Sequence, residues 1–369
     1  MHLRRGALLS LLLVASGCGG APAAQSPSAS LSASAAAKPA ASSAVGSASA
    51  KPGASAAASA AAKPASSTSV KVAYSQPAAG FAPVWVAQDK GFFKKYGLDA
   101  EVLQITPPAD TQSVISGEIQ FDVDGSGSMA AIASGANIPY IAITVPYFAQ
   151  SLYGQSSIQK VSDLVGKQVA TTTRGGSSDF ALRTLLAKEN VDPAKINFVY
   201  LRDDAAILAA MQAGTLQAAI ITSPNTLRAK QSGLREIVDM SKLRLRTLTQ
   251  GVNVRKEWAQ QHEDLVLAFL KAWMEGAKEG RSNPDGTKAI IGKYTKVTDQ
   301  AFLDEAYNTV VSLWAAYPLA NDQDLQNVID LSTEANVKAH TPADYYDNSY
   351  LQKLDSFVKQ LYPGGVPQA

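Results

Sequence analysis

Residues 70–98 read VKVAYSQPAAGFAPVWVAQDKGFFKKYGL, and this stretch decides the fold. Residues 70–75 alternate as a strand does, and residues 81–96 carry apolar side chains at helical spacing. The helical pattern stops at Gly97, a residue that commonly follows a helix end. Residues 98–105 alternate again. Strand, helix and strand in this order predict parallel strands in an α/β fold.

The same alternation continues along the chain in two series, and a helical part follows them. The first series adds strands at 121–124 and 140–145, with a helix at 126–134. The second series predicts strands at 168–172, 196–201 and 218–222, and helices at 178–189, 205–213 and after Pro224. From about Glu257 the pattern is helical, with helices expected at 265–278, 299–316, 322–340 and 350–361. Two βα series predict two α/β lobes.

The beginning of the chain has the pattern of a secretory leader. A basic start, an apolar segment at residues 6–14 and small residues lead to Cys18, the only cysteine of the chain. The residues before Cys18 resemble a bacterial lipobox, although Ala15 stands where that pattern prefers leucine. We expect a signal peptide at 1–17 and a lipid on Cys18. An ordinary signal peptide with an incidental cysteine is the alternative.

Residues 18–69 differ in composition from the rest of the chain. They consist almost entirely of Ala, Ser, Pro, Gly and Lys, so they offer too little apolar surface for a core and predict a disordered tether. The first 69 residues hold five basic residues and no acidic one, which leaves 28 basic and 31 acidic residues in the remainder. That balance does not indicate a nucleic-acid partner, which needs clustered positive charge.

Four blocks in register carry a resemblance to a known family. They lie at 70–98, 121–126, 162–170 and 211–219, and they resemble ABC-transporter substrate-binding proteins. The branch that they resemble includes the binders of aliphatic sulfonates, taurine, nitrate and thiamine-pyrimidine precursors. The resemblance implies a type II periplasmic-binding-protein fold, in which two lobes joined by two crossovers close over a ligand. Mapped onto this chain, lobe 1 is at 70–155 and 250–369, and lobe 2 is at 156–249.

The resemblance also implies a function. We expect an extracytoplasmic, lipid-anchored monomer that takes a small organic ligand, such as a sulfonate, carboxylate or pyrimidine, to an ABC permease with its ATPase. No cofactor, metal or catalytic residue is expected. A ligand-sensing subunit and an enzyme on the same fold remain the alternatives. The cysteine-rich motif of the pyrimidine-synthesising enzymes with this fold is absent.

Two loops rich in glycine and serine are the strongest ligand-binding candidates. Each joins a strand to a helix, where free backbone N–H groups and the helix dipole favour an anion. Plain helix capping is the alternative for either loop alone. Asp179, at the start of the second helix, argues against a highly charged anion. The candidates in these loops are Gly125, Ser126, Gly127, Arg174, Gly176, Ser177 and Ser178.

Other candidates lie at strand ends and at the expected crossover. Tyr147 and Tyr153 flank the crossover, where hinge packing explains them equally well; of the two, Tyr147 is taken as a ligand-binding candidate. The remaining candidates are Ser75, Gln76, Phe81, Thr222 and Ser223, of which the last two also fit a simple turn.

Enzyme motifs are weak in this chain. Residues 125–130 fit a dinucleotide-binding pattern, but no Asp or Glu follows before Asp163, and such a site needs one about twenty residues on. Asp122 and Asp124 alternate on a strand, so we expect them to face opposite sides and not to act as a pair.

Overall fold

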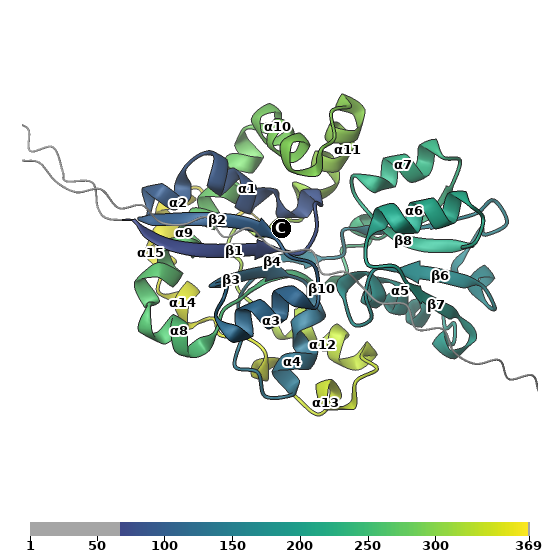
Figure 1. Ribbon diagram of the computed structural model, residues 1–369, viewed down its shortest axis with the longest axis horizontal. Helices are drawn as coiled ribbons and strands as arrows, with labels where there is room; N and C mark the ends of the chain where they lie inside the picture. Colours follow the sequence, from purple (N-terminus) through teal and green to yellow (C-terminus); the bar gives the residue numbers. More distant parts are fainter. Residues whose placement is uncertain (1–66, 368–369) are drawn as a thin grey trace, which may run out of the picture. The chain divides into compact units, whose positions relative to one another are not determined.

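The computed structural model describes residues 67–367, and their strands form two five-stranded sheets (Figure 1). The predicted signal peptide, Cys18 and nearly all of the predicted tether lie outside the described residues. The first sheet has the order β2 (Leu98–Gln104), β1 (Thr68–Tyr74), β3 (Phe121–Asp124), β10 (Arg246–Asn253), β4 (Tyr140–Tyr147). The second has the order β7 (Asn197–Tyr200), β6 (Gln168–Thr171), β8 (Ala218–Thr222), β5 (Gln150–Gly154), β9 (Arg235–Asp239).

Both sheets are mixed, which corrects the prediction of parallel sheets. The strands β1, β2 and β3 are parallel, as are β6, β7 and β8. However, β10 runs antiparallel to β3 and β4, and β5 runs antiparallel to β8 and β9. At both places the chain passes from one sheet to the other, because β4 and β5 belong to different sheets, and so do β9 and β10. The strands β5 and β10 therefore each enter their sheet at the end where β8 and β3 finish, and they run in the opposite direction to these strands.

The strand pairing bears on the predicted lobes. Residues 150–154 pair within the second sheet, and β10, which begins at Arg246, pairs within the first. The lobe limits stay a prediction. If strand pairing defines the lobes, the first limit moves from 155 to about 148, and the second limit moves from 249 to about 245. Thr68 and Ser69, which the predicted tether includes, belong to β1.

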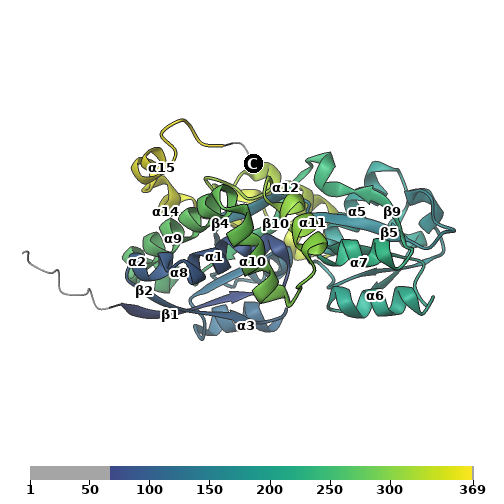
Figure 2. The ribbon, with the colours of Figure 1, turned by 90° about the horizontal axis from the view of Figure 1, so that it is seen from above.

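Helices flank both sheets. Those of the two βα series are α1 (Ala82–Asp89), α2 (Phe92–Lys95), α3 (Ala109–Ser116), α4 (Met129–Ala133), α5 (Ser177–Lys188), α6 (Asp204–Gln212) and α7 (Asn225–Gln231). The C-terminal helices are α8 (Lys256–Gln261), α9 (Glu263–Ser282), α10 (Pro284–Thr295), α11 (Gln300–Val310), α12 (Asp322–Leu331), α13 (Ala335–Lys338), α14 (Ser349–Gln352) and α15 (Asp355–Leu361). Figure 2 shows α1, α9 and α10 together beside the first sheet and α5, α6 and α7 beside the second.

Three predicted helices are divided in the structure. The expected helix at 322–340 is α12 and α13, and the one at 350–361 is α14 and α15. The expected helix at 81–96 is α1 and α2, because Gly91 between them adopts a left-handed φ of 74° that ends the first helix. Among the described residues, no helix is both long and apolar enough to span a bilayer.

The two largest of four hydrophobic clusters in residues 67–367 hold most of these elements. The first joins α1, α9 and the first sheet, and its rings Phe121 and Phe269 stack with centroids 4.1 Å apart. The second combines residues from both sheets with α12, for example Tyr140, Leu152 and Leu325. Trp85 and Trp314 are fully buried, as expected for core tryptophans. The second cluster anchors the strand ends at which the candidate site lies.

Candidate functional site

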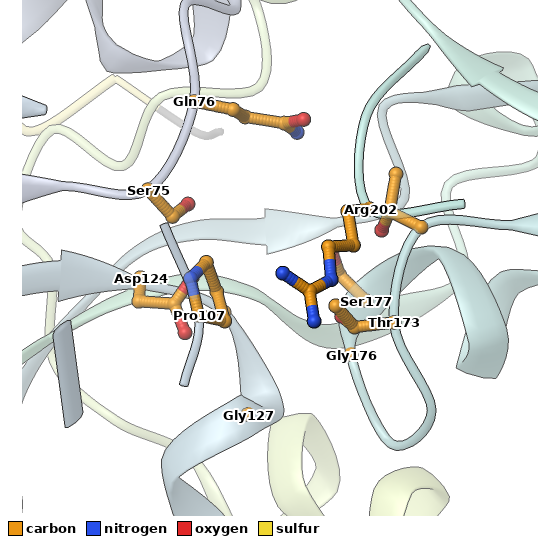
Figure 3. A pocket seen from close by; sticks show the side chains of 11 residues that line it. Ser75, Gln76, Pro107, Asp124, Gly127, Thr173, Gly176, Ser177 and Arg202 are labelled. Atoms are coloured by element: carbon orange, nitrogen blue, oxygen red, sulfur yellow. The ribbon is translucent and has the colours of Figure 1, made fainter. Parts of the chain in front are cut away.

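One pocket lies where parallel strands of both sheets end (Figure 3). In open α/β sheets, the carboxyl ends of the strands are where ligands bind. The pocket holds about 420 Å³ of empty space, including the solvent at its mouth. We call it the strand-end pocket. It is lined by Ser75, Gln76, Pro107, Asp124, Gly125, Gly127, Thr172, Thr173, Gly176, Ser177 and Arg202.

The N-terminus of α5 forms part of the pocket wall. Its N-cap is Gly176, and no side chain caps the helix. The first N–H groups of a helix have no partner within it, and the helix dipole makes this end attractive to an anion. Asp179 also lies at this end of the helix, but its negative charge is already paired. Its carboxylate accepts hydrogen bonds from the Gly175 amide and from Arg183 Nε, both at 3.0 Å. The Arg183 guanidinium therefore offsets the charge that argued against an anion.

Arg202 supplies the positive charge of the pocket. It follows β7, and its backbone has a φ of 70° while its N–H donates to the Thr172 carbonyl at 2.8 Å. Its side chain points into the pocket (Figure 3). Within residues 67–367 it takes part in no ion pair. An exposed guanidinium beside an uncapped helix start is suited to an anionic group.

The opposite wall contains a buried carboxyl. Asp124 ends β3, and burial raises the pKa of its carboxyl. Hydrogen bonds from the Gly125 amide and the Ser75 hydroxyl stabilise the ionised form and so offset a part of this rise. Behind it, Asp122 is fully buried, and neither of its carboxyl oxygens has a partner among the described residues. Burial, and then the charge of Asp124, raises the pKa of Asp110 to about 8.

The expectation that Asp122 and Asp124 face opposite sides was wrong. Residues two apart on a strand share a face, and burial followed by the charges of Asp110 and Asp124 raises the pKa of Asp122. Within the described part of the chain, no three His, Cys, Asp or Glu side chains form a group that could hold a metal ion.

These buried acids predict how stability depends on pH. A carboxyl whose pKa is raised on folding binds more protons in the native state than in the unfolded state, so stability falls as pH rises between the two pKa values. For Asp110 this range runs from about 4 to about 8, and the loss is at most about 1.4 kcal/mol per pH unit for each such group. We expect Asp110→Asn to reduce this slope in urea unfolding between pH 5 and 8. The exposed Asp99→Asn is the control, and an unchanged slope in Asp110→Asn would contradict the assignment.

Six of the sequence-predicted residues line the strand-end pocket, namely Ser75, Gln76, Gly125, Gly127, Gly176 and Ser177. The two glycine–serine loops come together there. The Ser126 hydroxyl donates to the Gly175 carbonyl at 3.1 Å, and a Cβ on Gly125 would lie 3.3 Å from the Ser177 Cβ.

Two other loop candidates have structural partners. Ser178 Oγ accepts from the Thr172 amide at 3.0 Å and therefore holds the start of α5 to the end of β6. The Arg174 guanidinium lies over the Tyr200 ring, 5.3 Å from its centroid, and Arg174 lines a neighbouring pocket together with Ser126. It is thus not among the residues that line the strand-end pocket.

The remaining candidates also lie outside the strand-end pocket. Phe81 is buried and packs against the Tyr74 and Trp85 rings. The guanidinium groups of Arg244 and Arg246 lie 4.2 and 5.4 Å from the Tyr147 ring centroid. The Thr222 amide donates to Asp204 at 2.8 Å, and the Ser223 hydroxyl donates to Glu305 at 2.8 Å.

Sequence reasoning missed five residues that line the pocket: Pro107, Asp124, Thr172, Thr173 and Arg202. Asp124, Thr172 and Thr173 stand at the ends of predicted strands, so the rule that pointed to the neighbouring loops applies to them too. Arg202 directly follows the predicted strand at 196–201, so the same rule applies to it, but it was passed over in favour of Arg174, which stands within a glycine–serine loop.

Glu305 on α11 connects the C-terminal helices to the turn after β8. Its carboxylate accepts from the hydroxyls of Ser223 and Thr226, each at 2.8 Å. Both hydroxyl residues are buried, so Glu305→Ala would leave two buried donors without partners. We expect a loss of about 1 to 3 kcal/mol of unfolding free energy in urea. The exposed Glu118→Ala should cost less than about 0.5 kcal/mol, and equal losses would show that this contact does not stabilise the fold.

Comparison with known proteins shows the family to which the chain belongs. The family described as NMT1/THI5 like matches residues 78–287. The taurine-binding periplasmic protein of Escherichia coli (strain K12) is 27% identical over 210 residues, which cover 55% of this chain and 64% of that protein.

Solved structures share the fold at low sequence identity. The periplasmic nitrate-binding protein of Synechocystis PCC 6803 has a TM-score of 0.67 and 17% identity, covering 82% of this chain and 92% of that one. The periplasmic aliphatic sulphonate binding protein of Escherichia coli has a TM-score of 0.61 and 18% identity, with 74% and 91% covered. A desulfurization enzyme also has this fold, with a TM-score of 0.55, 15% identity and coverages of 77% and 98%.

Proposed function

Because the chain belongs to the NMT1/THI5 like family, we propose that it is the extracytoplasmic solute-binding component of an ABC importer. Its relative in Escherichia coli is a periplasmic protein that binds taurine, and two proteins of the same fold bind nitrate and sulphonates. The strand-end pocket lies where two sheets meet, as a ligand held between two lobes requires. The two lobes close over the ligand, and a permease with its ATPase receives it from the closed form.

The ligand of this pocket is a small organic anion. The observation that carries this proposal is the pairing of an uncapped helix start with a guanidinium: α5 begins at Gly176 and Ser177, and Arg202 lines the same pocket. Backbone N–H groups and a guanidinium both donate to the oxygens of a sulfonate or carboxylate. Ser75 and Gln76 offer hydrogen bonds to the uncharged part of the ligand from the opposite wall.

The lipid anchor at Cys18 and a tether that ends before β1 belong to the same proposal. A chain fixed at the membrane surface by a lipid, with a flexible segment before its binding domain, stays near the permease while it captures solute.

The proposal is tested on the purified protein by calorimetry and small-angle scattering. The panel contains taurine, linear alkanesulfonates, nitrate, short carboxylates and a pyrimidine. We expect at least one anion to bind with a Kd in the micromolar range or below and to reduce the radius of gyration. If no member of the panel binds and the scattering stays unchanged, the proposal is wrong. Native mass spectrometry of the protein as purified identifies any ligand that it already carries.

A further inference from the structure

A second pocket adjoins the first and shares Gln76 and Arg202 with it. We propose that this side pocket is a distal subsite, and that the ligand is an elongated molecule with an anionic group at each end. One end occupies the strand-end pocket and the other meets Arg228 in the side pocket. This inference rests on the proposed function, because it extends the same ligand-binding site.

The side pocket has room for a substantial part of a ligand. It holds about 870 Å³ of empty space, including solvent at its mouth, against about 420 Å³ for the strand-end pocket. Its walls come from the ends of strands of both sheets, from the segments that follow these strands, and from α10. The lining residues are Gln76, Pro77 and Ala78 after β1, Gln104 and Thr106 at the end of β2, Arg202 and Asp203 after β7, Asp204 and Ala205 at the start of α6, Pro224 before α7, Asn225 and Arg228 in α7, Thr295 at the end of α10, and Val297 after it.

Arg228 is the second cation along this cavity. Its guanidinium donates to Asn225 Oδ1 at 3.1 Å and lies over the Phe302 ring, 5.8 Å from the centroid. These two contacts hold the side chain in place without neutralising it. In the part of the chain that the structure describes, neither Arg228 nor Arg202 forms an ion pair. A carboxylate or sulfonate oxygen would give Arg228 its missing partner.

Two acidic residues also line the side pocket, and each has a local role. The Asp203 carboxylate caps α6 by accepting from the Ala206 amide at 2.8 Å. Asp204 is buried and accepts from the Thr222 amide, and burial raises its pKa to about 7. At neutral pH the two carboxyls therefore carry less than two full negative charges beside two guanidinium groups. The Asp203 carboxylate already occupies the start of α6, so this helix start does not offer free N–H groups to an anion. The distal anionic group of the ligand is therefore held by Arg228.

The side pocket also offers apolar wall that suits a carbon chain. Pro77, Ala78, Ala205 and Val297 give the side pocket apolar wall between its polar residues. Each methylene group that is fully buried there tightens binding by about fourfold. The ligand class is therefore an α,ω-dianion with an aliphatic or ring spacer.

Calorimetry with matched pairs of carboxylates tests the subsite on the full chain. Each pair has one spacer length and differs only at the far end: butyrate with succinate, hexanoate with adipate, and octanoate with suberate. At the best spacer length we expect the diacid to bind about tenfold or more tightly than the monoacid. In Arg228→Gln this ratio should fall to about one. Arg235→Gln removes an exposed guanidinium that lines neither pocket, and this control should keep the tenfold ratio.

The outcomes separate this proposal from the one on which it rests. If monoacids bind but no diacid binds more tightly, the distal subsite is overturned while the solute-binding function stands. A tenfold ratio that survives in Arg228→Gln overturns the role of Arg228 and with it the subsite. If no carboxylate of either kind binds and the anion panel above also fails, both proposals fall.

Discussion

Replacing Arg202 by glutamine is expected to weaken binding of the proposed anionic ligand by roughly 10- to 100-fold, because a hydrogen bond to a charged group contributes about 1.5 to 3 kcal/mol. Arg202 is the only Lys or Arg among the residues that line the strand-end pocket. Its loss leaves the helix start of α5 as the one strong anion-binding element there. Calorimetry with the anion of the panel that binds most tightly gives the two Kd values. Binding should also become less sensitive to salt in the variant, since fewer charges are paired.

Arg174→Gln is the decisive comparison. The sequence favours Arg174, which stands within the glycine–serine loop, whereas the structure stacks it on Tyr200. We expect Arg174→Gln to change the Kd less than about threefold. A larger loss in Arg174→Gln than in Arg202→Gln would show that the ligand lies in the neighbouring pocket. Unfolding midpoints of both variants within about 2 °C of the parent would show that neither effect comes from misfolding.

Gly276→Ala is expected to cost about 3 kcal/mol of unfolding free energy. Gly276 lies in α9 against α1, and a Cβ there would stand only 2.3 Å from the Pro83 carbonyl oxygen and 3.1 Å from the Ala87 Cβ. The obstructing atom is backbone, so the two helices must separate, which opens the core around Trp85. This exceeds the gain of up to about 1 kcal/mol that alanine brings over glycine within a helix. Urea unfolding measures the difference.

Gly280→Ala is the matched control, because it makes the same change in the same helix. Its Cβ would lie 3.1 Å from Cζ3 of the Trp314 ring, so a shift of only a few tenths of an ångström in one side chain would relieve this contact. We expect the free energy of unfolding to change by less than about 1 kcal/mol. A Gly276→Ala variant as stable as the parent would mean that α1 and α9 are not in tight contact. Since α1 follows the loop that carries Ser75 and Gln76, the destabilised variant should also bind ligand less well.

Much of the fold follows from local pattern. The strands β3 and β8 have the predicted limits, and α5 and α6 lie within one or two residues of theirs. Each of these segments shows the hydrophobic period of a strand or a helix, and a glycine, proline or aspartate marks its ends.

The strands β5, β9 and β10 were missed. The segment RTLTQGVN of β10 is largely polar, yet nearly all of it is buried between β3 and β4. Only pairing with residues more than a hundred positions away makes it a strand.

The sequence by itself determined where ligand-binding loops can lie, since glycine and serine between a strand and a helix act through local backbone geometry. It therefore indicated Gly125, Gly176 and Ser177, which line one pocket in the structure. The tertiary structure alone decided which charges lie in that pocket. Arg174 is turned onto the Tyr200 ring, while Arg202 and Asp124 lie on facing walls. The direction of a long side chain depends on the neighbours that the fold brings to it, and these neighbours are distant in the sequence.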